Sequence, residues 1–139
     1  MIPLYAQDHD YSGLNVLAVD DVPLNLILVQ KMLSRFNFKI RTAANGQLAL
    51  DAVAEQKPDL ILLDLMMPGI DGFEVIRRLR DNPETADIRI VILSALNSNE
   101  DIVKGFNVGA NDFIMKPIIM EKLLTCVVTQ LQIVTANSK

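Results

Sequence analysis

The chain has 139 residues, of which 50% are hydrophobic and 22% charged, and its formal net charge is −4 with a pI near 4.9. This length fits one domain better than two. The acidic balance argues against a nucleic-acid-binding domain, whose surface usually carries a basic stripe. The one compact basic group, Arg77, Arg78 and Arg80, lies in a helical pattern and is expected to form a solvated helix face.

The cysteine and histidine content limits the chemistry further. Cys126 is the only cysteine, so no internal disulfide forms, and its apolar surroundings predict a small buried side chain rather than a nucleophile. His9 is the only histidine, which excludes a histidine-rich metal site. Charges interrupt every apolar run before it reaches the length of a membrane span, and residues 1–13 lack the pattern of a secretory signal. These features predict a cytoplasmic protein with no membrane partner.

Short apolar runs alternate with amphipathic segments after an N-terminal leader at residues 1–13. In chain order, the spacing of apolar residues predicts a strand at Leu14–Val19, a helix at Pro23–Phe36, a strand at Phe38–Ala43, a helix at Asn45–Gln56, a strand at Leu60–Leu63, a helix at Asp71–Arg80, a strand at Ile88–Leu93, a helix at Asn99–Val108, a strand at Asp112–Met115 and a helix at Ile118–Val134. The domain is thus expected over residues 14–134, with 135–139 as a tail or the start of a linker.

Five repeats of strand and helix predict an α/β fold in which a parallel sheet is covered by helices on both faces. The mostly apolar strands support this arrangement, because parallel strands are buried on both sides. A single doubly wound sheet of five strands suits the flavodoxin-like (βα)5 order 2-1-3-4-5. Alternation alone leaves another α/β strand order open.

Polar residues fall directly after four of the predicted strands. Asp20 and Asp21 follow the first strand, Asp64 the third, Ser94 the fourth and Lys116 the fifth. Because ligands bind at the carboxyl ends of parallel strands where the strand order reverses, these side chains are expected to converge. Clustered carboxylates favour a hard cation such as Mg²⁺. Each residue has a simpler interpretation as a helix cap, a turn residue or a solvated lysine. That interpretation is less convincing for all of them together, because it treats polar residues at the ends of four strands as a coincidence.

The motifs at these strand ends resemble the receiver family of two-component response regulators. The resemblance extends from about Leu14 to the last helix, and it is carried by Val19-Asp20-Asp21, Asp64-Leu65-Met66-Met67-Pro68-Gly69-Ile70-Asp71-Gly72, Ser94-Ala95 and Lys116-Pro117. It implies that Asp64 is the phosphoacceptor. It further implies a Mg²⁺ site made by Asp20, Asp21, Asp64 and the backbone carbonyl of Met66.

Other roles follow from the same resemblance. Ser94 and Lys116 are expected to contact the phosphoryl oxygens, and Ser94 and Phe113 to act as switch residues. Pro117 makes the Lys116–Pro117 bond a candidate cis peptide, which is essentially a proline option. Independently of the resemblance, Asn25 is expected to face solvent because it lies in the first helix.

The resemblance implies a signalling switch that catalyses only its own phosphorylation and dephosphorylation, and not an enzyme acting on other substrates. Its implied partners are a histidine kinase or phosphotransfer protein, and a homodimer through the fourth helix, fifth strand and last helix. The last helix supports such an interface, because it carries more apolar residues than one core-facing stripe needs: Met120, Leu123, Leu124, Val127, Val128, Leu131 and Val134.

Three other functions fit the residues less well. A phosphatase of the haloacid dehalogenase type needs a second aspartate two positions after the nucleophile, where this chain has Met66. A flavodoxin needs a Ser/Thr/Gly phosphate loop after the first strand, where Asp20 and Asp21 would repel a phosphate. A degenerate receiver that only binds partners would lack the phosphoacceptor or an acidic residue, and neither is missing.

Overall fold

The structure, a computed structural model, describes residues 3–7, 10–96 and 98–137, so His9 lies outside the described residues. The strands are β1 (Asn15–Val19), β2 (Lys39–Ala43), β3 (Leu60–Leu63), β4 (Arg89–Ser94) and β5 (Asp112–Met115). The α-helices are α1 (Pro23–Leu33), α2 (Gly46–Glu55), α3 (Gly72–Asp81), α4 (Asn99–Val108) and α5 (Met120–Asn137), and a short 3-10 helix, η1 (Leu4–Ala6), precedes them. None of the helices in these ranges combines the length and apolarity that a membrane span requires.

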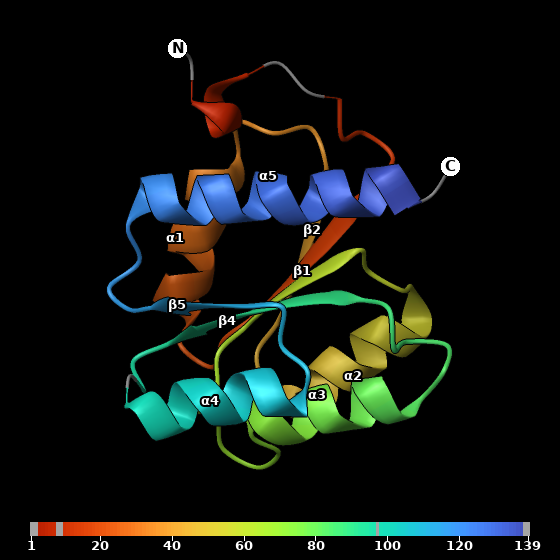
Figure 1. Cartoon of the computed structure of the whole chain (residues 1–139), viewed down its shortest axis with the longest axis vertical. Helices are drawn as coiled ribbons and strands as arrows, with labels where there is room; N and C mark the ends of the chain where they lie inside the picture. The colour runs from red at the N-terminus through yellow and green to blue at the C-terminus, as the bar shows by residue number, and fades with distance from the viewer. Residues whose placement is uncertain (1–2, 8–9, 97, 138–139) are drawn as a thin grey trace.

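The five strands form one parallel sheet in the order β2-β1-β3-β4-β5, which confirms the predicted flavodoxin-like topology. Helices α1 and α5 cover one face of the sheet, and α2, α3 and α4 cover the other (Figure 1). Neighbouring residues of a strand point to opposite faces. In β1, Val16 and Ala18 therefore join the core beneath α1 and α5, while Leu17 and Val19 join the core beneath the other three helices.

The helix boundaries follow local capping chemistry. The side chains of Asn45, Asp71 and Ser98 accept hydrogen bonds from backbone N–H groups of the first turns of α2, α3 and α4, as N-cap residues do. Helix α4 ends at Gly109, whose φ of 122° is accessible to glycine. Helix α1 ends at Leu33 rather than at the predicted Phe36, and a turn follows in which the N–H of Phe36 donates to the Leu33 carbonyl.

The last helix was predicted to carry apolar residues that the core does not need and that a partner would cover. This prediction is wrong for most of these residues. Five of the seven predicted apolar residues, Leu123, Leu124, Val127, Val128 and Leu131, are fully buried, because the sheet covers one side of the helix and the N-terminal segment contacts another. Val134 is partly buried. In that segment, Tyr11 is only 3% exposed and its ring packs edge-on against Phe36. Met120, at the start of α5, is the predicted interface residue of this helix that stays exposed.

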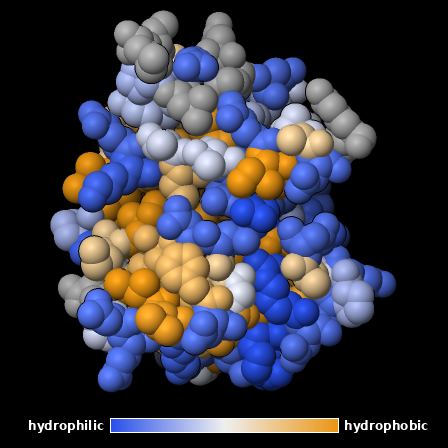
Figure 2. All heavy atoms as spheres, viewed as in Figure 1, coloured by the Kyte–Doolittle hydropathy of each residue, from blue (hydrophilic) through white to orange (hydrophobic). Residues whose placement is uncertain are grey.

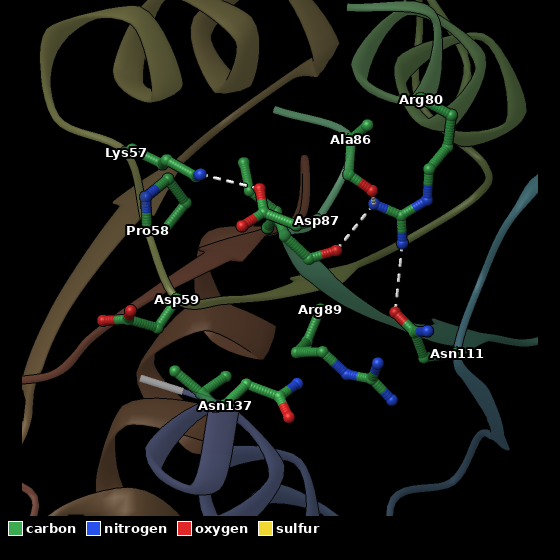
Figure 3. A pocket seen from close by; sticks show the side chains of 11 residues that line it. Lys57, Pro58, Asp59, Arg80, Ala86, Asp87, Arg89, Asn111 and Asn137 are labelled. Carbon is green, nitrogen blue, oxygen red and sulfur yellow. Dashed lines mark hydrogen bonds and ion pairs between the residues drawn. The ribbon is translucent and has the colours of Figure 1, made fainter. Parts of the chain in front are cut away.

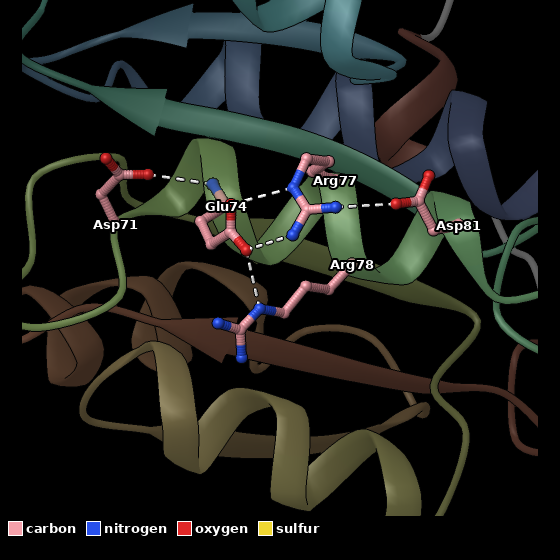
Figure 4. A network of polar contacts seen from close by, with 5 residues as sticks. All are labelled: Asp71, Glu74, Arg77, Arg78 and Asp81. Atoms are coloured by element: carbon pink, nitrogen blue, oxygen red, sulfur yellow. Dashed lines mark hydrogen bonds and ion pairs between the residues drawn. The ribbon is translucent and has the colours of Figure 1, made fainter.

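The basic group on α3 divides into two parts. Arg77 and Arg78 are exposed and pair with Glu74, and Arg77 also pairs with Asp81 (Figure 4). Hydrogen bonds from Arg77 and then Arg78 lower the pKa of Glu74 to about 2. For these two arginines the predicted solvated face is confirmed. For Arg80 it is wrong, because that side chain turns inward and donates to backbone carbonyls.

Candidate functional site

Three aspartates converge at the carboxyl ends of β1 and β3. These strands are neighbours in the sheet, so the residues that follow them, Asp20, Asp21 and Asp64, come together. One carboxylate oxygen from each lies within 4.8 Å of the other two. Asp20 and Asp64 are each 6% exposed, whereas Asp21 is open to solvent. The predicted convergence of the acidic residues is therefore confirmed.

Lys116 supplies a positive charge to this cluster. It follows β5, and its Nζ lies 2.9 Å from Oδ2 of Asp20 and 3.6 Å from Oδ2 of Asp64. Its backbone N–H donates to the carbonyl of Ser94, which joins the ends of β4 and β5. The Lys116–Pro117 bond is cis, as the sequence led us to expect. A solvated lysine is thereby excluded, because the Lys116 side chain is 19% exposed and faces two carboxylates.

The hydrogen bonds of Asp20 rule out the helix-cap interpretation. The cap position of α1 is Val22, and no side chain caps that helix. Instead, Oδ1 of Asp20 accepts from the Val22 N–H at 2.9 Å, and Oδ2 accepts from Nδ2 of Asn25 at 3.0 Å. The prediction that Asn25 faces solvent is wrong. Its place in the first turn of α1, five residues after Asp20, is the sequence signal that could have placed it beside the strand end.

Burial dominates the electrostatics of Asp64. Desolvation raises the pKa of its carboxyl group, Lys116 opposes that rise, and the neighbouring Asp20 charge adds to it. One ammonium group is shared by two buried carboxylates, with a third carboxylate close by. This donor set of hard oxygens with excess negative charge fits a divalent cation such as Mg²⁺.

Ser94 and Phe113 lie outside the acidic cluster. Ser94 ends β4, is fully buried, and its Oγ accepts from the N–H of Leu96 at 3.1 Å. Phe113, in β5, is half-buried and packs toward α4. Gly105 of α4 leaves room for its ring, since an added Cβ there would lie 3.3 Å from Cδ2 of Phe113.

Three sulfur-containing residues lie in different environments, and the burial of Cys126 was predicted from the sequence. Cys126 is buried, and desolvation raises the pKa of its thiol to about 12, with the nearby Asp112 charge adding to the rise. A thiol with that pKa stays protonated and is not a nucleophile. Met66, two residues after Asp64, is 56% exposed at the mouth of the site, whereas Met67 packs into the core.

Fold and site together define a doubly wound α/β signalling domain with an acidic cluster and a lysine at the carboxyl edge of its sheet. The family described as the response regulator receiver domain matches residues 16–128, and the chain belongs to this family. It is therefore a receiver domain of the two-component type, as the motifs indicated.

Named relatives and a solved structure support this assignment. Response regulator PleD of Caulobacter vibrioides is 44% identical over 103 residues, which are 74% of this chain and 23% of PleD. Protein PilH of Pseudomonas aeruginosa is 34% identical over 109 residues, which are 78% of this chain and 90% of PilH. The receiver domain of a LuxO repressor protein from Vibrio parahaemolyticus superposes with a TM-score of 0.84 at 28% identity, over 89% of this chain and 94% of that one. The chain spans about a quarter of the first curated relatives that it matches.

Proposed function

We propose that Asp64 accepts a phosphoryl group from a histidine kinase or phosphotransfer protein, in a reaction that depends on Mg²⁺. The observation that carries this proposal is the position of the Asp64 carboxylate, which is buried, lies 3.6 Å from the Lys116 ammonium and lies within 4.8 Å of two further carboxylates. Asp20, Asp21, Asp64 and the backbone carbonyl of Met66 would hold the ion. When bound, Mg²⁺ neutralises charge on the phosphoryl oxygens and orients the group for in-line transfer.

The residues of the chain supply the remaining chemistry. An Asp64 carboxylate oxygen forms the new bond to phosphorus, while the bond to the donor's imidazole nitrogen breaks and that nitrogen keeps the electron pair. Lys116, which pairs with Asp20 and Asp64, turns its ammonium charge toward the incoming phosphoryl oxygens. The Ser94 hydroxyl, at the end of β4, donates to another of these oxygens. Catalysis is then positioning and electrostatic stabilisation.

Exposed apolar residues beside the site suit the docking of a helical phosphodonor. Leu24, Ile27 and Leu28 of α1 are 60%, 48% and 45% exposed, and Ile119 and Met120 across the β5–α5 connection are 53% and 49% exposed. Apolar side chains exposed in groups tend to mark protein interfaces. We therefore place the phosphodonor over α1 and the start of α5, where its histidine can reach Asp64.

The output surface is proposed to be the face formed by α4, β5 and α5. Apolar atoms gather over α4 and β5 on this face (Figure 2), where Val103, Phe106 and Met115 are 55%, 45% and 51% exposed. Phosphorylation would draw Ser94 toward the phosphoryl group and let Phe113 move in the space beside Gly105. The surface would then favour a second copy of the chain or another partner.

Phosphodonor labelling tests the central step. The protein is incubated with Mg²⁺ and acetyl phosphate, and the phosphoryl group is located by intact mass and peptide mapping. We expect one phosphoryl group on Asp64 and none in Asp64→Asn. Asp71→Asn is the matched control, because asparagine is also a good N-cap and this exposed residue caps α3. Wild-type labelling in Asp64→Asn would overturn the proposal.

Sedimentation velocity tests the dimer. Samples with and without beryllofluoride, an analogue of the phosphoryl group, are compared at high protein concentration. Self-association that increases with the analogue and disappears in Phe106→Ser supports the proposed surface. A monomer in both states contradicts the homodimer while leaving Asp64 phosphorylation intact.

A further inference from the structure

Figure 3 shows a pocket of about 520 Å³. It lies at the amino ends of the strands, opposite to the end that carries Asp64. Its walls come from the amino ends of strands, where Asp59 precedes β3, Arg89 begins β4 and Asn111 precedes β5. Arg80 of α3 and Lys57, after α2, complete its polar lining. The volume is in the range of pockets that hold small molecules, and none of these residues takes part in phosphoryl transfer.

The two arginines of this pocket have no acidic partner within ion-pair distance in the part of the chain that the structure describes. Arg80 donates to the carbonyls of Gly109, Ala86 and Ile88 and to Oδ1 of Asn111, all of them neutral oxygens. Arg89 donates its Nε–H to Oε1 of Gln130, which is neutral as well. Partly buried cations are ordinarily paired with an anion. Burial, and then the nearby Arg89 charge, lower the pKa of Arg80, while the Asp87 charge opposes the shift. A negative charge between the two guanidinium groups would therefore stabilise both.

Donors of Arg89 and Asn111 remain free among the residues that the structure describes. Oδ1 of Asn111 accepts from the Ile90 N–H at 2.8 Å and from Arg80 at 3.0 Å, which assigns its other terminal atom as the NH₂ group. Among the described residues, no acceptor is recorded for that NH₂ group or for the two terminal nitrogens of Arg89. Figure 3 shows both guanidinium groups on the Asn111 side of the pocket, with Lys57 on the other.

The two carboxylates of the pocket are already engaged. Oδ2 of Asp59 accepts from the backbone N–H and the side-chain amide of Asn15, and Asp87 pairs with Lys57 at 2.6 Å. The Lys57–Asp87 pair is solvent-exposed, and pairs of that kind contribute little stability. Lys57 can therefore exchange Asp87 for a ligand at small cost. Three cationic and two acidic side chains line the pocket, which leaves it net positive.

We infer that this pocket binds a small phosphorylated molecule, with the phosphate held by the terminal nitrogens of Arg89 and the amide of Asn111. The planar guanidinium of Arg89 can hold two phosphate oxygens side by side. The Asn111 amide belongs to the loop before β5 and the Lys57 ammonium to the opposite side of the pocket (Figure 3), so the donors come from different directions, which suits a tetrahedral group better than a planar carboxylate. The apolar surfaces of Pro58, Ile88 and Val134 contact the remainder of the ligand.

The test is an NMR titration of the whole chain in buffer stripped of divalent cations, which prevents anion binding at the acidic cluster. Inorganic phosphate, adenosine 5′-monophosphate and succinate are added at constant ionic strength while the Arg89 Nε–H and Asn111 side-chain amide signals are followed. Both phosphates should shift these signals saturably at millimolar concentrations, and succinate should not. Arg89→Gln should weaken binding at least about tenfold, because it removes a charge-assisted fork. The exposed Arg35→Gln is the matched control.

The Arg89→Lys variant tests the geometry of the contact with phosphate. Arg89→Lys keeps the charge but loses the fork, so weakened binding in this variant supports bidentate contact. Shifts that are absent, that do not saturate, or that persist unchanged in Arg89→Gln overturn the inference. Succinate binding as tightly as phosphate would contradict the phosphate class. If Arg89→Gln fails to fold, the wild-type shifts at Arg89 and Asn111 still locate the ligand or exclude it.

Discussion

Replacing Asp64 by asparagine is expected to stabilise the protein in the absence of Mg²⁺. The Asp64 carboxylate is 6% exposed, and burial raises its pKa above the ordinary value of 3.8. A raised pKa means that folding penalises the charged form of the carboxyl group. Asparagine has nearly the same shape and no charge, so it removes the penalty while keeping the packing of the site.

The distances in the site give the size of this effect. With an effective dielectric constant of 20, attraction to Lys116 across 3.6 Å favours the Asp64 charge by about 5 kcal/mol. Repulsion from Asp20 across at most 4.8 Å opposes it by at least about 3.5 kcal/mol. Solvent screens most of the repulsion from Asp21, which is exposed, but desolvation of Asp64 costs several kcal/mol more. We expect a net stabilisation of about 1–3 kcal/mol, within the usual range for single substitutions.

Thermal unfolding followed by circular dichroism measures the difference. For a chain of this length, 1 kcal/mol corresponds to about 3–4 °C in Tm, so Asp64→Asn should unfold about 3–12 °C higher at neutral pH. Below the unfolded-state pKa of 3.8, Asp64 is protonated in both states and the variant gains nothing. The gain develops as the pH rises from 3.8 through the raised folded-state pKa, and it is complete above that value.

Two results would refute this reasoning. Equal or lower stability of Asp64→Asn at neutral pH would show that attraction to Lys116 equals or exceeds the cost of burying the Asp64 charge. A stabilisation that does not change with pH would show that shape or hydrogen bonding, rather than charge, is responsible. Asp71→Asn serves as the control, because Asp71 is exposed and asparagine preserves its cap.

Three further predictions concern the metal, the switch and the N-terminal segment. Asp21→Ala should remove most Mg²⁺ binding in titration calorimetry, because the exposed Asp21 carboxylate faces the open side of the cluster, and unchanged affinity would show that it is not a ligand. Lys116→Ala should still bind Mg²⁺, since an ammonium group does not ligate it, but beryllofluoride should no longer shift the Phe113 ring signals in NMR; a full wild-type shift would contradict the role of Lys116. Tyr11→Ala should lower the free energy of unfolding in urea by about 3 kcal/mol, because a buried aromatic ring is lost; a change near zero would mean that the N-terminal segment does not stabilise the domain.

The order of polar and apolar residues along the chain was sufficient to predict a parallel α/β fold and the residues of the main site, whereas alternation alone left the strand order open. Alternating strands and helices imply a parallel sheet, and such a sheet brings the residues after its strands to one edge. Asp20, Asp21, Asp64 and Lys116 were predicted together for this reason, and the structure confirms that they meet. This part of the structure is encoded locally, because each side chain needs only to follow its own strand.

The contacts of Asn25 and Arg80 depended on the tertiary structure. Asn25 was expected in solvent, but the first turn of α1 directs it to Asp20. Arg80 has the same helical pattern as Arg77, yet it points toward carbonyls of the β4 and β5 connections. A helical pattern indicates which residues share one face of a helix. Which part of the protein contacts that face depends on how the helix packs in the fold.

The last helix shows the same division between sequence and structure. Its many apolar residues correctly indicated that more than one side of α5 is covered. The sequence pattern could not indicate which segment covers the second side of α5. The interface prediction assigned that role to a partner protein. In the structure, Leu123, Val127 and Leu131 are covered within the same chain, in a core that Tyr11 and the partly buried Tyr5 join. Apolar burial is non-directional, so composition determines how much surface must be covered, while the path of the chain in three dimensions determines which segment covers it.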